Sequence, residues 1–389
     1  MVVFFAKEKE QMKNEEAIRI LHVIGGMERG GAEVLLISLY RHINRTQIQF
    51  DFVVHTDKDC AFDAEIYSLG GLIYHCPRYT IKNHVKYTRW WNNFFASHPE
   101  YKIVHGHQRS TASIYLRIAK KNKITTIAHS HAVSSRGNLS EKAIKAVLQY
   151  HIRYVADWFM ACSPEAGKWL FGKKIVASDR FIWLKNAIEV DRFTFDSAKR
   201  ETVRKEYGIG NFLVFGHIGS FTPVKNHKFL IDVFYEILRH NEDTKLLLIG
   251  AGECKQRTEE YVQRLGMKNN VIFAGDRDDV ADILQAMDVF VFPSKHEGFG
   301  ISVLEAQTAD LPVIVSNNVP HEIAVTERIE FVPLSDGAQI WAHKAIAKAE
   351  ITQRRNLASE IKSAGYDAAT ETGKLTSFYQ SISSYSGSV

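Results

Sequence analysis

The sequence lacks the features that mark several classes of protein. Its 389 residues include only four cysteines, none in a CxxC pair, which argues against a disulfide framework or a zinc knuckle. No stretch approaches the run of about 18 apolar residues that spans a bilayer. Eight prolines and 24 glycines exclude collagen-like and low-complexity chains. With 45% hydrophobic and 24% charged residues, the composition is that of a globular protein long enough for two domains.

The amino terminus and the charge distribution bear on location and partners. Residues 1–17 combine a short apolar patch with mostly charged residues, without the apolar core and cleavage site of a signal peptide. We therefore expect a flexible extension and a cytoplasmic protein. Residues 1–190 hold 27 basic and 17 acidic residues, whereas residues 191–389 hold 22 and 27. The basic half indicates either ordinary surface solubility or an anionic partner such as a pyrophosphate, lipid phosphates or nucleic acid.

Short apolar strands alternate with helical segments along the chain. The first series has expected strands near 18–24, 50–55, 72–75, 103–105, 125–129 and 158–162, and a second series, after Asn186, has them near 213–218, 244–249, 271–273, 289–292 and 312–315. This alternation predicts an α/β fold of two Rossmann-like domains with parallel sheets. The expected domains are residues 18–188 and 189–370. Residues 371–389 are expected to form a C-terminal helix that returns to the N-terminal domain.

The strongest local signal lies in residues 292–306, where a strand ends, a glycine-rich loop follows and a helix begins near Ile301. The amides of residues 298–300 then lie at a helix N-terminus, where unpaired N–H groups and the helix dipole favour an anion. Glu297 and Glu305 add carboxylates, which accept hydrogen bonds from vicinal hydroxyls. Hydroxyls together with a diphosphate describe a nucleotide sugar.

The same segment resembles the E-x7-E motif of the retaining glycosyltransferases of family 4, which have the GT-B fold of two Rossmann-like domains facing across a cleft. The resemblance runs from Ile18 to about Tyr385 and includes Gly30-Gly31-Ala32-Glu33, Asn186-Ala187-Ile188-Glu189, Lys225-Asn226-His227, Gly250-Ala251-Gly252-Glu253, Asp279-Val280 and Asp288-Val289-Phe290-Val291-Phe292-Pro293-Ser294. Members that build capsular or exopolysaccharide repeat units are the most similar. The resemblance implies metal-independent, cofactor-free transfer of a sugar, with retention, from a nucleotide diphosphate sugar to a hydroxyl of a glycan or lipid-linked acceptor.

The resemblance also implies roles for individual positions. Glu305 is expected to hold the ribose hydroxyls and Glu297 the hydroxyls of the donor sugar. Lys225 is expected to pair with the departing diphosphate, and His129 to lie at the donor sugar. Further donor-binding positions are Gly30, Gly31, Ser220, Gly250, Asp276, Arg277, Gly298, Phe299, Gly300 and Ile301, and the acceptor side is expected to include His107, His131 and Arg29.

One position departs from the family pattern. The family has Gly-Arg after the first strand of the second domain, and here the pair is Gly219-Ser220, so the diphosphate lacks one of its two usual cations. Arg29 is the residue that we expect to compensate, because its planar fork suits phosphate oxygens; the alternative is that it only solvates a loop tip. A pseudo-transferase that binds a nucleotide sugar without turnover and a GT-B nucleotide-sugar epimerase stay as alternatives.

Histidines and one aromatic stretch leave two further questions. His129 and His131 alternate at the end of a strand, so only one of them is expected to face the ligand, and no His/Asp/Glu set has the spacing of a metal site. The basic and aromatic stretch 82–95 fits either an interfacial helix on anionic lipid or a sheet-covering helix with its rings in the core, which we favour. A peripheral contact with the inner face of the cell membrane stays open, and no nucleic-acid partner is expected.

Overall fold

The chain folds into two compact units. In a computed structural model, residues 17–131 and 139–385 are described. Unit 1 comprises residues 1–187 and 368–389, and unit 2 comprises residues 188–367. The extension expected over residues 1–17 lies, apart from residue 17, outside the described residues. Within the described ranges, no helix is both long and apolar enough to cross a membrane.

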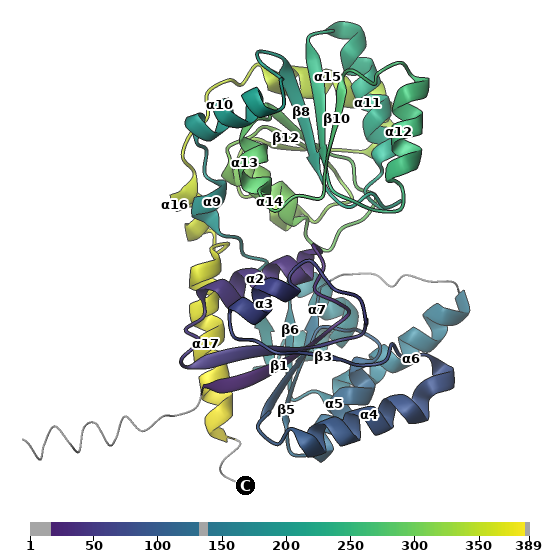
Figure 1. The fold of residues 1–389 in the computed structure, drawn as a ribbon, viewed down its shortest axis with the longest axis vertical. Helices are drawn as coiled ribbons and strands as arrows, with labels where there is room; N and C mark the ends of the chain where they lie inside the picture. Colours follow the sequence, from purple (N-terminus) through teal and green to yellow (C-terminus); the bar gives the residue numbers. More distant parts are fainter. Residues whose placement is uncertain (1–16, 132–138, 386–389) are drawn as a thin grey trace, which may run out of the picture. The chain divides into compact units, whose positions relative to one another are not determined.

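Unit 1 is built on a seven-stranded parallel sheet (Figure 1). Its strands are β1 (Ile18–Ile24), β2 (Ile48–Val54), β3 (Ile73–His75), β4 (Ile103–Gly106), β5 (Thr125–Ser130), β6 (Trp158–Ala161) and β7 (Phe181–Trp183). Their order across the sheet is β3-β2-β1-β4-β5-β6-β7. The central strands are apolar and almost fully buried because helices cover both faces of the sheet.

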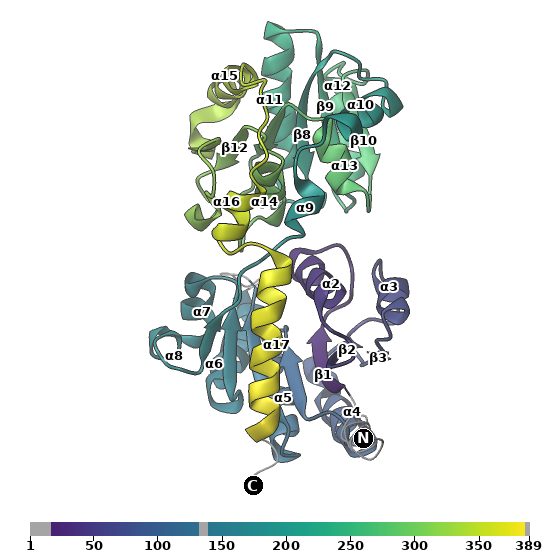
Figure 2. The ribbon, with the colours of Figure 1, turned by 90° about the vertical axis from the view of Figure 1, so that its left-hand side faces the viewer.

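The helices of unit 1 form two layers. They are α2 (Gly31–His42), α3 (Asp63–Ser68), α4 (His84–Ser97), α5 (Ala112–Lys121), α6 (Leu139–Val155), α7 (Pro164–Phe171), α8 (Lys173–Val176) and α17 (Ala368–Tyr385), with a 3-10 turn at Ile81–Asn83. Helices α4, α5 and α6 share one core, in which Trp91, Phe94 and Phe95 are buried. The favoured interpretation of the aromatic stretch is therefore confirmed for these three rings. Helices α2 and α17 pack on the other face, and Figure 2 shows α17 running along the strands.

Unit 2 repeats the architecture with a six-stranded parallel sheet in the order β10-β9-β8-β11-β12-β13. The strands are β8 (Leu213–Ile218), β9 (Thr244–Ile249), β10 (Val271–Gly275), β11 (Val289–Phe292), β12 (Val313–Ser316) and β13 (Ile329–Val332). The helices are α9 (Val190–Phe193), α10 (Ser197–Glu206), α11 (His227–His240), α12 (Lys255–Arg264), α13 (Val280–Gln285), α14 (Ile301–Thr308), α15 (Gly337–Ala349) and α16 (Ala358–Ser363), with 3-10 turns at His321–Ile323 and Leu334–Asp336.

Each sheet has a point at which the strand order reverses direction. In unit 1 the reversal falls between β1 and β4, and in unit 2 it falls between β8 and β11. Loops that leave two such strands diverge to opposite sides of the sheet, which opens a crevice at the carboxyl ends of the strands. The loops after β8 and β11, and the residues after β1, β4 and β5, are therefore the positions to inspect for chemistry.

Candidate functional site

The loop between β11 and α14 presents free backbone donors at a helix N-terminus. Helix α14 begins at Ile301, as the sequence predicted, and Gly300 is its N-cap with φ of +96° and no capping side chain. In the part of the chain that the structure describes, the N–H groups of residues 298–300 donate to no backbone carbonyl. The left-handed backbone at Gly300 favours glycine, and the unused donors together with the helix dipole suit an anion.

Lys225 and Glu297 meet beside this loop. The Nζ of Lys225 lies 2.7 Å from Oε1 of Glu297 and 4.7 Å from the centre of the Phe292 ring. Both side chains keep some access to solvent, 19% for Lys225 and 13% for Glu297. Ser294, to which the sequence analysis gave no role, donates its hydroxyl to the same carboxylate oxygen at 2.6 Å. The structure thus joins one cation and one anion from the loops after β8 and β11.

The loops after β8 and β9 approach each other closely. Gly250 has φ of +139°, and a Cβ atom there would lie 2.3 Å from the carbonyl oxygen of Gly219. Only glycine fits that backbone without moving the neighbouring loop. Ser220 is exposed at the same place, and Lys225 is the only cation in residues 219–226. Ser220 therefore lies exposed near the start of the loop that carries Lys225. No other residue of this loop replaces the arginine that the family pattern has at position 220.

Glu305 lies in the second turn of α14 and is nearly buried, with 7% of its surface exposed. Burial raises the pKa of its carboxyl group from 4.5 to about 7, and Arg192 opposes that rise. A buried carboxyl group with a raised pKa is costly for the folded chain when it is ionised. Such a group is better explained by a ligand that donates hydrogen bonds to it than by stability.

Five further expected residues belong to the loop after β10 and to the segment at the start of α2. In unit 2, Arg277 binds Asp279 through Nε and Nη2 at 2.7 and 2.5 Å, and Asp276 beside it is exposed. In unit 1, Gly30 is the N-cap of α2, Gly31 is its first residue, and the guanidinium carbon of Arg29 lies 5.9 Å from the centre of the Phe62 ring. All of these residues except Gly31, which begins α2, lie on loops, and their contacts with a donor stay predictions.

The histidines of unit 1 gather more tightly than expected. His129 and His131 stack with ring centres 4.0 Å apart, and a ring nitrogen of His107 lies 2.8 Å from one of His131. Residues two positions apart along a strand point to the same face, which agrees with the stacking of His129 on His131, and which of the two faces a ligand stays a prediction. His22 of β1 and His105 of β4 complete the group. The spacing of these histidines along the sequence does not reveal the cluster, because its members come from three different strands.

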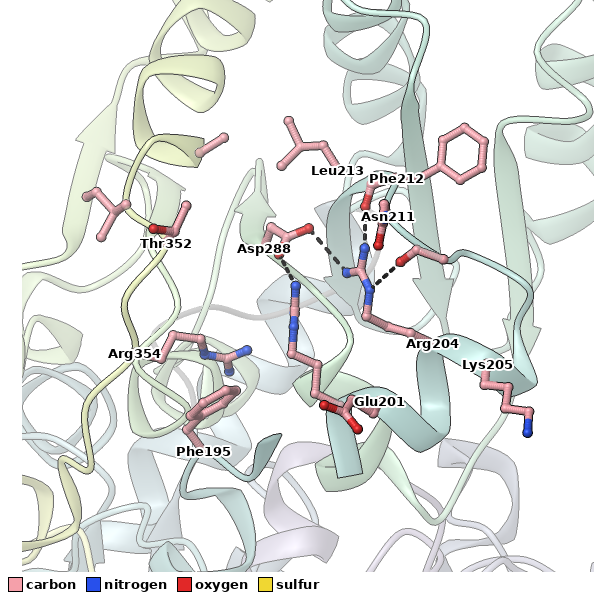
Figure 3. A pocket seen from close by; sticks show the side chains of 14 residues that line it. Phe195, Glu201, Arg204, Lys205, Asn211, Phe212, Leu213, Asp288, Thr352 and Arg354 are labelled. Carbon is pink, nitrogen blue, oxygen red and sulfur yellow. Dashed lines mark hydrogen bonds and ion pairs between the residues drawn. The ribbon is translucent and has the colours of Figure 1, made fainter. Parts of the chain in front are cut away.

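A cavity of about 700 Å³ lies elsewhere in unit 2 (Figure 3). It is located at the amino ends of the strands, next to Leu213 at the start of β8 and Asp288 just before β11. Arg200 binds Asp288 at 2.5 Å, Arg204 donates to the carbonyl of residue 286, and Arg354 donates to that of residue 285. These arginines tie α10 and the 350–355 segment to the end of α13. The cavity therefore lies at the opposite end of the sheet from Lys225 and Glu297, and the arginines that line it join structural elements of unit 2.

Family models match both units. Residues 199–338 match the model described as glycosyl transferases group 1, and residues 29–192 match the model described as Glycosyltransferase Family 4. EpsF of Bacillus subtilis (strain 168), a protein named as a glycosyltransferase, is 29% identical over 94% of this chain and 97% of its own length. The capsular polysaccharide biosynthesis glycosyltransferase CapH of Staphylococcus aureus is 21% identical over 94% of this chain and 99% of its own.

Solved structures share the same architecture. Anabaena Alr3699/HepE, crystallised with UDP and glucose, superposes with a TM-score of 0.76 at 18% identity, over 94% of this chain and all of that one. WaaG, a glycosyltransferase involved in lipopolysaccharide biosynthesis, superposes with a TM-score of 0.69 at 21% identity, over 92% and 99% of the two chains. The two sheets, the loop before α14 and the matches to both family models agree: the chain belongs to the GT-B glycosyltransferases of family 4.

Proposed function

We propose that the protein transfers a sugar, with retention of configuration, from a nucleotide diphosphate sugar to a hydroxyl of a glycan or lipid-linked glycan during cell-surface polysaccharide synthesis. The observation that carries the proposal is the set around α14: the Lys225–Glu297 pair, the unused amides of residues 298–300 and the buried Glu305. Cation, N–H donors and carboxylates match a diphosphate joined to two sugars rich in hydroxyls.

In this proposal each group of unit 2 has one task. Glu305 accepts hydrogen bonds from the ribose hydroxyls, and Glu297 accepts them from the donor sugar. Lys225 and the amides of residues 298–300 stabilise the negative charge that develops on the diphosphate as it leaves. Glu297 positions Lys225 through the 2.7 Å contact, so the cation is in place before the donor arrives. No metal ion takes part in the step.

Unit 1 is assigned the donor sugar and the acceptor. His129 is proposed at the donor sugar, Gly30 and Gly31 near the diphosphate, and His107, His131 and Arg29 on the acceptor side. A lipid-linked acceptor would place the enzyme at the inner face of the cell membrane as a peripheral protein. The E. coli protein named as a UDP-Gal:alpha-D-GlcNAc-diphosphoundecaprenol alpha-1,3-galactosyltransferase supports that class of acceptor; it is 27% identical over 56% of this chain and 58% of its own.

Release of nucleoside diphosphate tests the proposal. The purified chain is incubated with a panel of nucleotide sugars that differ in base and sugar, with and without a lipid extract as acceptor source, and nucleoside diphosphate is quantified. One donor class is expected to stand out. Lys225→Ala is expected to lower that rate about 10²–10³-fold, the usual cost of removing one donor to a developing anion.

Lys228→Ala is the matched control, because Lys228 lies on the outer side of α11 and pairs with Asp232 at 2.8 Å. It is expected to leave the rate unchanged. Binding of a nucleotide sugar without any release would favour the pseudo-transferase, and interconversion of two free nucleotide sugars would favour the epimerase. Equal rates in the Lys225→Ala and Lys228→Ala variants would contradict the role given to Lys225.

A further inference from the structure

Five histidines lie together where the strand order of unit 1 reverses. His22 comes from β1, His105 and His107 from the end of β4, and His129 and His131 from the end of β5. All except His131 are buried, and burial together with the neighbouring imidazoles lowers the pKa of His107 and His129 well below the ordinary value. Neutral imidazole is the form that binds metals, so protons do not compete at neutral pH.

The hydrogen bonds divide the ring nitrogens into committed and available ones. Nε2 of His107 lies 2.9 Å from Nδ1 of His22, and Nδ1 of His129 lies 3.1 Å from Nε2 of His105. Nδ1 of His107 faces Nε2 of His131 at 2.8 Å. Nε2 of His129 is buried and has no hydrogen-bond partner among the described residues. Nε2 of His22 and Nδ1 of His131 are also buried without a partner among the described residues. Buried ring nitrogens normally have a partner, so these free nitrogens require an explanation.

We propose that His107, His129 and His131 form a binding site for one divalent transition-metal ion of the zinc type. Each of the three residues can offer one ring nitrogen such that all three nitrogens lie within 4.8 Å of one another. The proposed ligand atoms are the free Nε2 of His129 together with Nδ1 of His107 and Nε2 of His131, which contact each other at 2.8 Å. The ion replaces the hydrogen bond between His107 and His131, whose nitrogens separate slightly to reach a Zn–N distance of about 2.0–2.1 Å.

The remaining histidines act as outer partners that orient two of the three ligands. If His107 binds through Nδ1, its Nε2–H donates to His22. If His129 binds through Nε2, its Nδ1–H donates to His105, whose own Nδ1–H donates to the hydroxyl of Tyr379 at 2.7 Å. One consistent set of tautomers therefore satisfies these three hydrogen bonds. A second hydrogen bond on the far ring nitrogen is the usual arrangement for a histidine that ligates a metal.

The chemistry of the ligands selects the ion. Three imidazoles and no carboxylate favour zinc, copper or nickel over magnesium and calcium, which prefer oxygen ligands. Burial lowers the pKa of His131 to about 3, and the positive charge of Arg109 lowers it further, so local charge does not favour a cation there. A water or hydroxide in the open fourth position offsets part of the ion's charge.

A second triad, His22, His105 and His107, also brings three ring nitrogens within 4.8 Å. We favour the outer triad because the ion can reach it. His22 and His105 are fully buried, with His22 packed against Phe50 and Phe52, whereas His131 keeps partial access to solvent and provides a path for the ion. Each triad contains one buried Nε2 without a partner, that of His22 or that of His129, so the free nitrogens do not decide between them.

The proposed function assigns the same three histidines to the donor sugar and the acceptor, so a bound ion and the substrates exclude each other there and the ion takes no part in transfer. Zinc binding to the full chain is therefore tested without any nucleotide sugar, and its outcome does not depend on the proposed function. Protein without a histidine tag is stripped with a chelator, titrated with zinc chloride by calorimetry, desalted and analysed for metal. One ion per chain is expected. His129→Asn and His131→Asn are each expected to weaken binding by more than the roughly 10–100-fold that is typical for the loss of an outer partner. His22→Asn is expected to fall within that range.

His75→Asn is the matched control, because His75 is an exposed histidine on β3 outside the cluster, and it is expected to bind zinc like the native chain. Folding of each variant is checked by circular dichroism. The absorption spectrum of the native chain with cobalt gives a measurement that needs no variant, since a tetrahedral nitrogen site differs from the hydrated ion. Absence of stoichiometric zinc, an unchanged affinity in His129→Asn and His131→Asn, or a loss confined to His22→Asn would overturn the proposal.

Discussion

Replacing Glu305 with glutamine is expected to stabilise unit 2 at neutral and alkaline pH while it weakens nucleotide binding. The carboxyl group is almost fully buried in α14, and its pKa is raised from 4.5 to about 7 because burial penalises the charged form. Glutamine has nearly the same shape and carries no charge. The variant therefore removes the penalty of ionisation and keeps the packing of the helix.

The pKa fixes both the size and the direction of the effect. A carboxyl group whose pKa is higher in the folded chain binds more protons there than in the unfolded chain between pH 4.5 and about 7. Stability of unit 2 thus falls as the pH rises through this window, by up to about 3 kcal/mol. Glu305→Gln should be close to the native chain at pH 5 and more stable at pH 8 by up to about 3 kcal/mol.

Hydrogen exchange of amides in β8, β9 and β11 reads the opening free energy of unit 2 separately from unit 1. After correction for intrinsic rates, the native chain and Glu305→Gln are compared at pH 5 and pH 8. Glu360→Gln, in an exposed position of α16, is the control and should show no pH-dependent difference. Donor affinity of Glu305→Gln should fall about 10–100-fold, as for a lost hydrogen bond to a charged group. A stability difference from the native chain that is equal at both pH values would refute the reasoning.

Three further predictions address catalysis. Glu297→Ala is expected to reduce sugar transfer while nucleoside diphosphate still binds, and comparable loss of diphosphate affinity by calorimetry would count against its place at the donor sugar. Ser220→Arg is expected to raise donor affinity or turnover and Arg29→Ala to lower one of them; if steady-state kinetics show no change in either variant, Lys225 and the loop amides hold the diphosphate alone. Transfer is expected to persist in EDTA, and a loss restored by magnesium or manganese would contradict metal independence.

The loop before α14 could be predicted from sequence because its signals are local. A buried strand, a glycine cluster and an apolar helix lie consecutively between residues 289 and 308, so the order of residues already sets their neighbours. The start of α14 at Ile301 follows from Gly300, whose left-handed conformation suits glycine. In contrast, β13 at Ile329–Val332 was not predicted, since four residues beside a charged segment give too short an apolar pattern.

The contacts that decide the chemistry depend on several strands. The pairing of Lys225 with Glu297 requires the loops after β8 and β11 to be neighbours, which follows from the strand order and not from either loop. The histidine cluster is the stronger case, because its members come from β1, β4 and β5 and from the residues directly after β4 and β5. Sequence periodicity describes one strand at a time, so it misses groups that only a sheet assembles.

The most direct test of the account is hydrogen exchange of the whole chain with and without the nucleotide sugar that the panel selects. The account predicts that donor binding protects residues 219–226 and 293–305, which carry Lys225, Glu297 and Glu305. Protection of these peptides should disappear in Lys225→Ala at the same donor concentration and persist in Lys228→Ala. Protection confined to residues 200–213, beside the cavity at the amino ends of the strands, would contradict the assignment of the donor site.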